Sequence, residues 1–240
     1  MKPIAIFRHT PAEGSGYFAE FLNQHGLPWE LIRIDEGEHV PHNARDFSGL
    51  VFMGGTMSVN DDLPWMQFTL PLIRDAIAHD VPLLGHCLGG QLMSKALGGV
   101  VTKNPVKELG WGKVEVADNA TAREWFGDIK SFDSFHWHGE TFTLPPGAVH
   151  LLASSHCPNQ AFAIGKHLAL QCHVEMTEHM IREWCEAGAD ELAAHASSPA
   201  VQSAEVMQTE MHDKLPELHR VATQLYRHWL LCFVYYFSGK

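Results

Sequence analysis

Residues 81–99, "VPLLGHCLGGQLMSKALGG", join an apolar run to a helical pattern through a glycine-rich turn. The apolar run ends at Gly85, and Cys87 follows it by two positions. Beyond the turn, apolar residues recur at the spacing of one helix face: Leu92, Met93, Ala96 and Leu97. The segment therefore predicts a buried strand, a sharp turn at Cys87 and a helix.

Strand-like and helix-like segments alternate through the first hundred residues. Apolar, β-rich runs occupy 3–9, 29–35 and 47–55, and helical periodicity occupies 17–22 and 65–77. Alternation of this kind predicts βαβ units and a parallel sheet. The fold class predicted is therefore α/β, with a doubly wound and mostly parallel sheet.

After residue 100 the pattern changes to closely spaced strands. Five such segments are separated by turn residues: "GKVEVAD", "SFDSFHWHGETFTL", "VHLLASS", "QAFAIGK" and "HLALQCHVE". We expect them to extend the sheet with an antiparallel part. From Thr177 onward the chain predicts helix, with a break near 197–199 and a last helix from about Pro216.

Composition limits the classes of protein that fit. The 240 residues, 45 % hydrophobic and 19 % charged, suffice to bury one core. A net charge of −11 argues against nucleic acid or an anionic membrane as a partner. The five cysteines form no CxxC pair, which argues against a disulfide framework or a tetrathiolate zinc site.

Neither end of the sequence predicts a membrane segment. The first ten residues, "MKPIAIFRHT", carry Arg8 and His9 where a signal peptide needs an apolar core. The longest apolar run, "WLLCFVYYF" at 229–237, is about half a membrane span. We expect a cytoplasmic protein, in which this run is either the buried face of the last helix or a docking or dimer surface.

Cys87 stands where a parallel sheet binds its ligands, beyond the carboxyl end of a strand. Glycines at positions −2 and +2 and the change from strand to helix match a cysteine form of the nucleophile elbow. The positive end of the following helix favours a thiolate. The alternative is that Cys87 is a small buried apolar residue, as free cysteines often are.

A thiolate nucleophile needs a base and a group that orients the base. In "HLALQCHVEMT", residues 167–177, His173 ends an apolar strand and Glu175 is two positions on. Side chains two apart in an extended chain point the same way, so Glu175 can accept a hydrogen bond from His173. His86 is a poor base, because neighbouring strand residues face opposite ways.

Two further features accompany these residues. The loop "MGGTMSVND", 53–61, follows the strand beside Cys87, so Gly54 or Gly55 could donate an N–H to an oxyanion together with Leu88. Zinc could be bound by His136-x-His138 or by Cys172-His173, but a third ligand and an open position would need independent support. We predict no metal and no cofactor.

With these motifs the chain resembles the class I glutamine amidotransferases, and within them most closely the amidotransferase domain of GMP synthase. The family's G-x-C-x-G-x-Q is met at 85–91, and its H-P-E is met by His173, Val174 and Glu175. Three more segments resemble GMP synthase: "KELGWGKVEV", "WHGETFTLPPGA" and "SHCPNQAFAIG". The similarity runs in order from about residue 45 to 180.

The resemblance implies a flavodoxin-like fold and a glutaminase half-reaction. Cys87 would attack the amide of glutamine and release ammonia, with His173 as the proton carrier and Glu175 as its orienting group. The N–H groups of Gly55 and Leu88 would then hold the oxyanion. The substrate's α-amino-acid end would lie at three residues: Gln91, His138 and Gly139.

The resemblance also sets the expected organisation. An amidotransferase domain would occupy 1–195, and a helical extension packed on it would occupy 196–240. Val174 and Thr56 each replace a proline that is usual in the family. The Ser-Gly-Gly loop of the GMP synthase ATP-pyrophosphatase domain is absent from this sequence, so complete GMP synthesis by this chain alone is not expected.

Three functions stay open at this point. The chain could make ammonia for a separate synthetase subunit, or hydrolyse γ-glutamyl peptides and conjugates alone, or be a non-enzymatic binding module. The partners predicted are glutamine or a γ-glutamyl substrate, with a synthetase or a second copy of the chain as protein partners. No nucleic acid and no membrane is expected.

Overall fold

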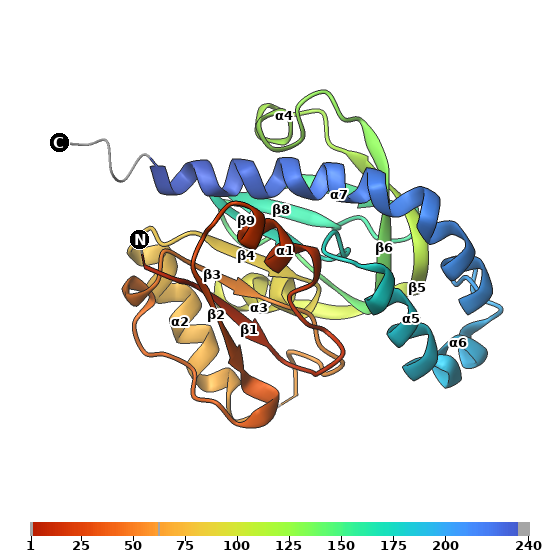
Figure 1. Cartoon of the computed structure of the whole chain (residues 1–240), viewed down its shortest axis with the longest axis horizontal. Helices are drawn as coiled ribbons and strands as arrows, with labels where there is room; N and C mark the ends of the chain where they lie inside the picture. The colour runs from red at the N-terminus through yellow and green to blue at the C-terminus, as the bar shows by residue number, and fades with distance from the viewer. Residues whose placement is uncertain (1, 62, 235–240) are drawn as a thin grey trace.

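A computed structural model describes residues 2–61 and 63–234. One nine-stranded sheet, in the order β2-β1-β3-β4-β9-β8-β7-β5-β6, runs through the middle of the molecule (Figure 1). Five strands are parallel: β1 (Ile4–Arg8), β2 (Trp29–Arg33), β3 (Gly49–Phe52), β4 (Leu83–His86) and β9 (His167–Leu170). Four more continue the sheet in antiparallel pairs: β5 (Val101–Val116), β6 (Ser131–Phe142), β7 (Val149–Ser154) and β8 (Ala161–Ile164).

The helices cover both faces of this sheet. They are α1 (Gly16–Gln24), α2 (Met66–Ala78), α3 (Leu88–Ala96), α4 (Ala120–Phe126), α5 (Glu178–Ala187), α6 (Ala189–His195) and α7 (Ala204–Val234). The predicted doubly wound α/β fold with an antiparallel extension and a helical C-terminal part is confirmed. None of the helices among the described residues has a stretch long and apolar enough to cross a membrane.

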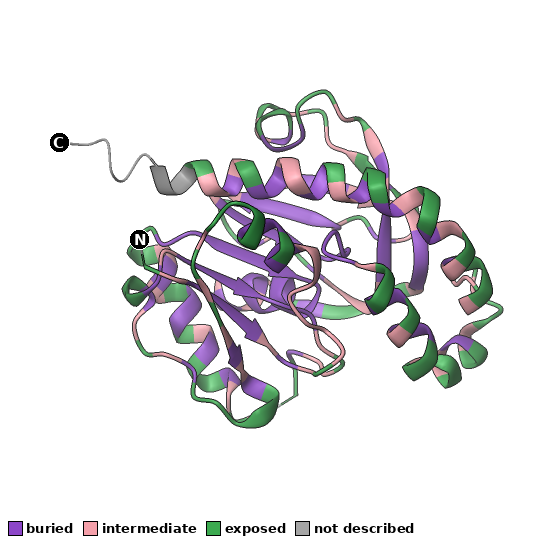
Figure 2. Ribbon diagram, in the orientation of Figure 1, coloured by how far each residue is buried: buried purple, intermediate pink, exposed green. Residues whose placement is uncertain are grey.

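Two apolar cores arise because strand residues alternate between the faces of the sheet. On β1, Ile4 and Ile6 belong to the core that includes residues of α1 and α7. Their neighbours Ala5 and Phe7 belong to the core that includes residues of α2 and α3. The central strands are buried on both faces (Figure 2), as the near-continuous apolar runs in the sequence predict.

The prediction that the last helix begins near Pro216 is wrong. Helix α7 begins at Ala204, and Pro216 lies within it. Proline removes one backbone hydrogen bond, but the residues before it bury apolar side chains in the core, among them Met207 and Met211. Because this burial outweighs one lost bond, the helix continues through Pro216, and it changes direction along its length (Figure 1).

Helix α7 is joined to the parallel half of the molecule by aromatic side chains. The ring of Tyr226 meets that of Phe18 on α1 edge-on, with centroids 4.8 Å apart. Trp229 is buried and donates from Nε1 to the carbonyl of Leu83 on β4 at 3.0 Å. The helical extension therefore packs against the strand that leads to Cys87, while the domain boundary predicted at 195 stays a prediction.

Only part of the apolar run 229–237 falls within the described side chains. Trp229 is buried, whereas Leu231 is 57 % exposed. The side chains of residues 232–237 lie outside the described ones, so a docking or dimer surface there stays a prediction.

The packing of α3 against β3 depends on Gly89. A Cβ built on this residue would lie 2.0 Å from the carbonyl oxygen of Phe52, the last residue of β3. Alanine in place of glycine inside a helix normally stabilises by about 1 kcal/mol. Here the contact is with backbone, so the clash exceeds that gain.

We therefore expect Gly89→Ala to lower the free energy of unfolding by about 1–3 kcal/mol. Gly14→Ala is the control, because a Cβ there meets nothing within 4 Å. Thermal unfolding of both variants and the wild type measures the difference. Equal melting temperatures for the two variants would contradict the close approach of α3 to β3.

Candidate active site

The turn at Cys87 is strained, and it is stabilised by a backbone hydrogen bond and made possible by the glycines that flank it. Cys87 has φ 49° and ψ −105°, a conformation that costs a residue with a Cβ about 1–3 kcal/mol. Its N–H donates to the carbonyl of Leu170 on β9 at 2.8 Å. A Cβ on Gly85 would lie 2.5 Å from the backbone of Gly89, so both flanking glycines are needed for the close approach of β4 and α3. The predicted elbow is present.

The thiol of Cys87 lines a cavity of about 750 Å³ although only 5 % of the residue is exposed. Its Sγ lies 3.9 Å from the carbonyl oxygen of Trp137, and the side-chain amide of Gln171 donates to Sγ at 3.5 Å. Burial raises the pKa of the thiol, and the charge of the neighbouring His173 opposes this rise. A ligand in the cavity can therefore reach this sulfur, and the hydrogen bond from Gln171 holds it in place.

His173 and Glu175 form a buried pair. Nδ1 of His173 donates to Oε1 of Glu175 at 2.7 Å, and each side chain is 1 % exposed. His173 also exchanges backbone hydrogen bonds with Phe135 of β6, and the ring of Trp184 packs edge-on against its imidazole. The Nε2 atom of His173 has no hydrogen-bond partner among the described residues. The ring is thus fixed in place with one nitrogen free to exchange a proton.

The pKa shifts of this pair follow from its isolation. Burial opposes a charge on His173, but the charges of Glu175 and Cys87 outweigh it and raise the pKa of His173 well above its usual range. Burial also opposes ionisation of Glu175, yet the charges of His86 and His173 lower the pKa of Glu175 to about 2. The carboxylate therefore stays ionised at neutral pH and favours a protonated His173.

His86 lies on the opposite side of Glu175 from His173. Its Nε2 is 3.7 Å from Oε2 of Glu175 and 3.4 Å from the hydroxyl of Tyr226 on α7. Burial lowers the pKa of His86, against the opposing charge of Glu175. His86 makes no hydrogen bond to Cys87, as its position next to the cysteine on the strand predicts. Its contact with Glu175 and Tyr226 was not predicted, because it depends on where α7 packs.

Gly55 and Leu88, predicted to hold the oxyanion, are brought together. A Cβ on Gly55 would lie 2.7 Å from the side chain of Leu88, so the loop after β3 rests on the first turn of α3. Gly55 and the following Thr56 line the same cavity as Cys87. The expected crossover that places β3 beside β4 is also present.

The three residues predicted at the substrate's α-amino-acid end line the cavity as well: Gln91, His138 and Gly139. The amide of Gln91 donates to Gln171 at 3.1 Å, and Gln171 in turn contacts Cys87, so Gln91 is part of a chain that holds the thiol. Both ring nitrogens of His138 have protein partners, which are the carbonyl of Glu140 and the carboxylate of Glu108. A ligand in the cavity can therefore bind the backbone at 138–139, but not the ring nitrogens of His138.

Glu13 belongs to the cavity, although no motif in the sequence predicts it. Its carboxylate lies against the loop after β3, because a Cβ on Gly54 would be 1.8 Å from Oε2. Burial raises the pKa of Glu13 to about 7, against the opposing charge of His173. Only the strand order could have indicated this residue. Because β3 alone separates β1 from β4, the loops that follow β1 and β4 meet at one edge of the sheet.

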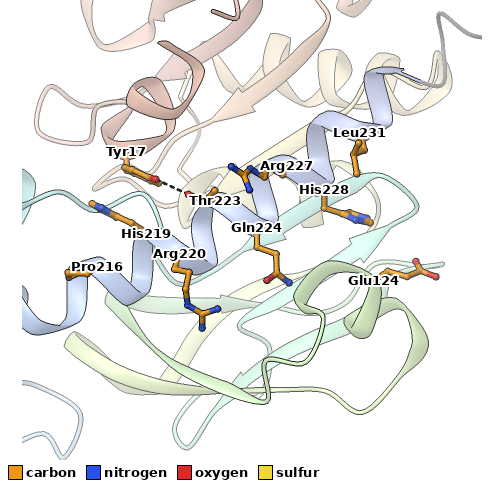
Figure 3. A pocket seen from close by; sticks show the side chains of 10 residues that line it. All are labelled: Tyr17, Glu124, Pro216, His219, Arg220, Thr223, Gln224, Arg227, His228 and Leu231. Atoms are coloured by element: carbon orange, nitrogen blue, oxygen red, sulfur yellow. Dashed lines mark hydrogen bonds between the residues drawn. The ribbon is translucent and has the colours of Figure 1, made fainter. Parts of the chain in front are cut away.

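A second hollow, of about 650 Å³, runs along α7 (Figure 3). It shares no lining residue with the cavity of Cys87. Tyr17 and Thr223 point toward each other there, with their hydroxyls 2.8 Å apart. None of the residues predicted to act in catalysis lies in it, so the cavity at Cys87 is the candidate active site.

Comparison with known proteins agrees with this geometry. Residues 18–183 match the family described as glutamine amidotransferase class-I. The chain belongs to this family. The crystal structure of a glutamine amidotransferase from Methylobacillus flagellatus is 44 % identical, with a TM-score of 0.94 over 97 % of this chain and 95 % of that one.

Two curated relatives of the family extend the comparison. The glutamine amidotransferase-like protein YfeJ of Salmonella typhimurium is 27 % identical over 86 % of this chain and 91 % of its own length. One subunit of the glutamine-hydrolysing GMP synthase of Sulfolobus acidocaldarius is 37 % identical over 54 % of this chain and 65 % of its own length. The predicted similarity to GMP synthase amidotransferases is confirmed.

Glu13 makes the stability of the folded protein fall as pH rises. Its pKa is about 7 in the folded protein against 4.5 as the ordinary value, so the folded state binds the proton more tightly. Its contribution to stability is therefore present at low pH and lost as pH rises from about 4.5 to 7. Replacing Glu13 by a neutral residue should therefore stabilise the protein most at pH values where the carboxyl of Glu13 is charged.

We expect the melting temperature of Glu13→Gln, relative to wild type, to be higher at pH 8 than at pH 5. The exposed Glu20→Gln is the control, with the same difference expected at both pH values. Thermal unfolding at the two pH values measures this. An unchanged difference for Glu13→Gln would show that its carboxyl does not change charge in this range.

Proposed function

We propose that this chain hydrolyses the γ-amide bond of a glutamyl substrate through a thioester on Cys87. The observation that carries the proposal is a strained cysteine in the cavity, interacting with a histidine that is hydrogen-bonded to a buried carboxylate. Cysteine, oriented base and carboxylate are the parts that nucleophilic catalysis of acyl transfer needs. The family membership supports glutamine as the amide.

Each step uses one of these groups. Cys87 gives its thiol proton to Nε2 of His173, and its sulfur bonds to the amide carbon. The carbonyl oxygen becomes negative and is held by the N–H groups of Gly55 and Leu88. The leaving nitrogen takes a proton from Nε2 of His173, the carbon–nitrogen bond breaks and ammonia departs. Water then gives a proton to His173 and attacks the thioester, which releases glutamate and restores the thiol. Glu175 keeps the imidazole oriented and stabilises its charge throughout.

The electrostatics favour this division of roles. The ionised Glu175 raises the pKa of His173, so the ring can hold the proton that it later gives to the leaving amide nitrogen. That positive ring opposes the effect of burial on Cys87 and stabilises the attacking thiolate. Val174, which replaces the family's usual proline, lies between His173 and Glu175 in the sequence, and both of these side chains are kept.

Ammonia made here would pass to a separate synthetase subunit. This part of the proposal rests on the similarity to a protein named as one subunit of a GMP synthase. Gln91 and the backbone at 138–139 would bind the α-amino-acid end of glutamine, because all three residues line the cavity that contains Cys87. Glutamine is then the substrate, and a synthetase is the protein partner.

A second candidate is a stand-alone hydrolase of γ-glutamyl peptides or conjugates. The cavity of about 750 Å³ is within the range of sites for drug-sized ligands, and its wall extends to His195 at the end of α6 and to Ser198 beyond it. A substituent on the amide nitrogen would fit in this space. A binding module without chemistry would need neither the strain at Cys87 nor the buried His173–Glu175 pair.

Release of glutamate and ammonia from free glutamine, compared with release of glutamate from a γ-glutamyl dipeptide, tests the proposal. We expect slow turnover of glutamine and no turnover of the dipeptide if a synthetase is the partner. Rapid turnover of the dipeptide alone would establish the second candidate. No turnover of either substrate would contradict the proposed hydrolysis.

The same assay tests the residues. Cys87→Ala should abolish turnover, whereas Cys157→Ala, which removes a buried thiol outside the cavity, should retain it. His173→Ala should reduce turnover by at least about 10³-fold, and Glu175→Ala by less, since water can partly replace an orienting group. Turnover by Cys87→Ala would overturn the thioester mechanism.

A further inference from the structure

Three buried side chains converge behind the wall of the cavity. Glu108 of β5 and His136 and His138 of β6 each offer one atom, and these atoms lie within 4.8 Å of one another. The residues are 4 %, 1 % and 5 % exposed. Glu108 is the third candidate ligand that the sequence could not supply for His136-x-His138, because only the pairing of β5 with β6 brings it there.

The hydrogen bonds of the two rings turn their other nitrogens toward this point. Nε2 of His138 donates to Glu108 there, and it would give up that proton on binding an ion. Nε2 of His136 donates to the carbonyl of Gly112 at 3.2 Å, and Nδ1 of His138 donates to the carbonyl of Glu140 at 2.9 Å. A carbonyl can only accept, so each of these nitrogens carries a hydrogen. Metal-binding histidines are held by this kind of hydrogen bond from the nitrogen that does not bind the metal.

The side chain of Gln160 completes the group. Its terminal Nε2 lies 2.8 Å from Oε2 of Glu108, 3.4 Å from Nδ1 of His136 and 3.4 Å from Nε2 of His138. The same nitrogen also lies 3.2 Å from the hydroxyl of Ser154. An amide nitrogen has two hydrogens for these four neighbours, while Oε1 of Gln160 is buried without a partner. Turning the amide over places an oxygen at the centre of the group.

The spacing of the four atoms suits a small ion. The distances from the Gln160 amide atom to the other three are 2.8–3.4 Å, and Glu108 and His138 are 3.1 Å apart. Ligands placed 2.0–2.1 Å from a tetrahedral zinc are roughly 3.3 Å from one another. His136 lies within 4.8 Å of both Glu108 and His138, so an inward movement of its side chain would complete that geometry.

The charge of Glu108 also calls for a cation. Oε1 of Glu108 accepts from the hydroxyl of Ser154 at 2.7 Å and Oε2 accepts from Nε2 of His138 at 3.1 Å, so both oxygens act as acceptors, as in a carboxylate. No lysine or arginine in the described part of the chain forms an ion pair with it. A buried carboxylate whose hydrogen-bond partners are a hydroxyl, an amide and an imidazole gains more from a divalent ion than from these groups.

We propose that Glu108, His136, His138 and Gln160 bind one zinc-like divalent transition-metal ion. Nitrogen and oxygen ligands of this kind select zinc and its neighbours rather than magnesium or calcium. Four protein ligands leave no open position, so the site is structural. It fixes the part of β6 around Trp137, whose carbonyl lies 3.9 Å from Sγ of Cys87. The proposal does not depend on which substrate the cavity binds.

Titration of chelator-treated full-length protein with Zn²⁺, followed by calorimetry, tests this. We expect one equivalent to bind and to raise the melting temperature of the wild type. Glu108→Gln keeps the shape of the side chain without its charge, and should weaken binding at least about tenfold. His179→Asn, on the exposed face of α5, should bind as the wild type does.

Two further measurements separate this site from Cys87 and His173. Cys87→Ser should still bind one Zn²⁺, and Co²⁺ bound to the wild type should show tetrahedral ligand-field bands without a thiolate-to-cobalt band. The Co²⁺ spectrum needs no variant, so it decides the matter even if Glu108→Gln fails to fold. Absence of stoichiometric binding, a thiolate band, or loss of binding in Cys87→Ser would overturn the proposal.

Discussion

The tight turn at Cys87 holds β4, α3, β3 and β9 in contact. Its backbone has a positive φ, and the strain is offset by a hydrogen bond to Leu170 and by burial of the flanking segments. Because Gly85 and Gly89 let the backbones approach, α3 lies directly against the end of β3. The loop that carries Gly55 is then brought to the start of α3. The side of the cavity formed by Gly55, Cys87 and Gln91 follows from this one turn.

A buried negative charge at Glu175 is the second constraint. Removing a carboxylate from water is costly unless other groups stabilise it, and here His173 lies on one side and His86 on the other. Tyr226 of α7 contacts His86, so the long C-terminal helix reaches the site through a chain of two side chains. This explains why the helical extension is part of the core: it closes the face of the sheet under the site.

Local patterns were sufficient to predict the elbow, the His173–Glu175 pair and the alternation of strands and helices. Each depends on residues within about seven positions of one another. Glu13, Tyr226 and Glu108 were not predicted to contact the site, because their places depend on strand order and on the packing of α7. The start of α7 was misplaced for the same reason: Pro216 is a local stop signal that burial in the core overrides. Local chemistry was readable from the sequence, and long-range partners were not.

The central claim is that Cys87 carries the glutamyl group during the reaction. Peptide mapping by mass spectrometry, after the wild type is mixed with glutamine and quenched in acid, tests it directly. A glutamyl adduct on the peptide that contains Cys87, and on none of the peptides that contain the other four cysteines, is the predicted result. Glutamate release with the adduct on another residue would contradict the account. So would glutamate release by Glu175→Ala, quenched at steady state, with no adduct on any residue.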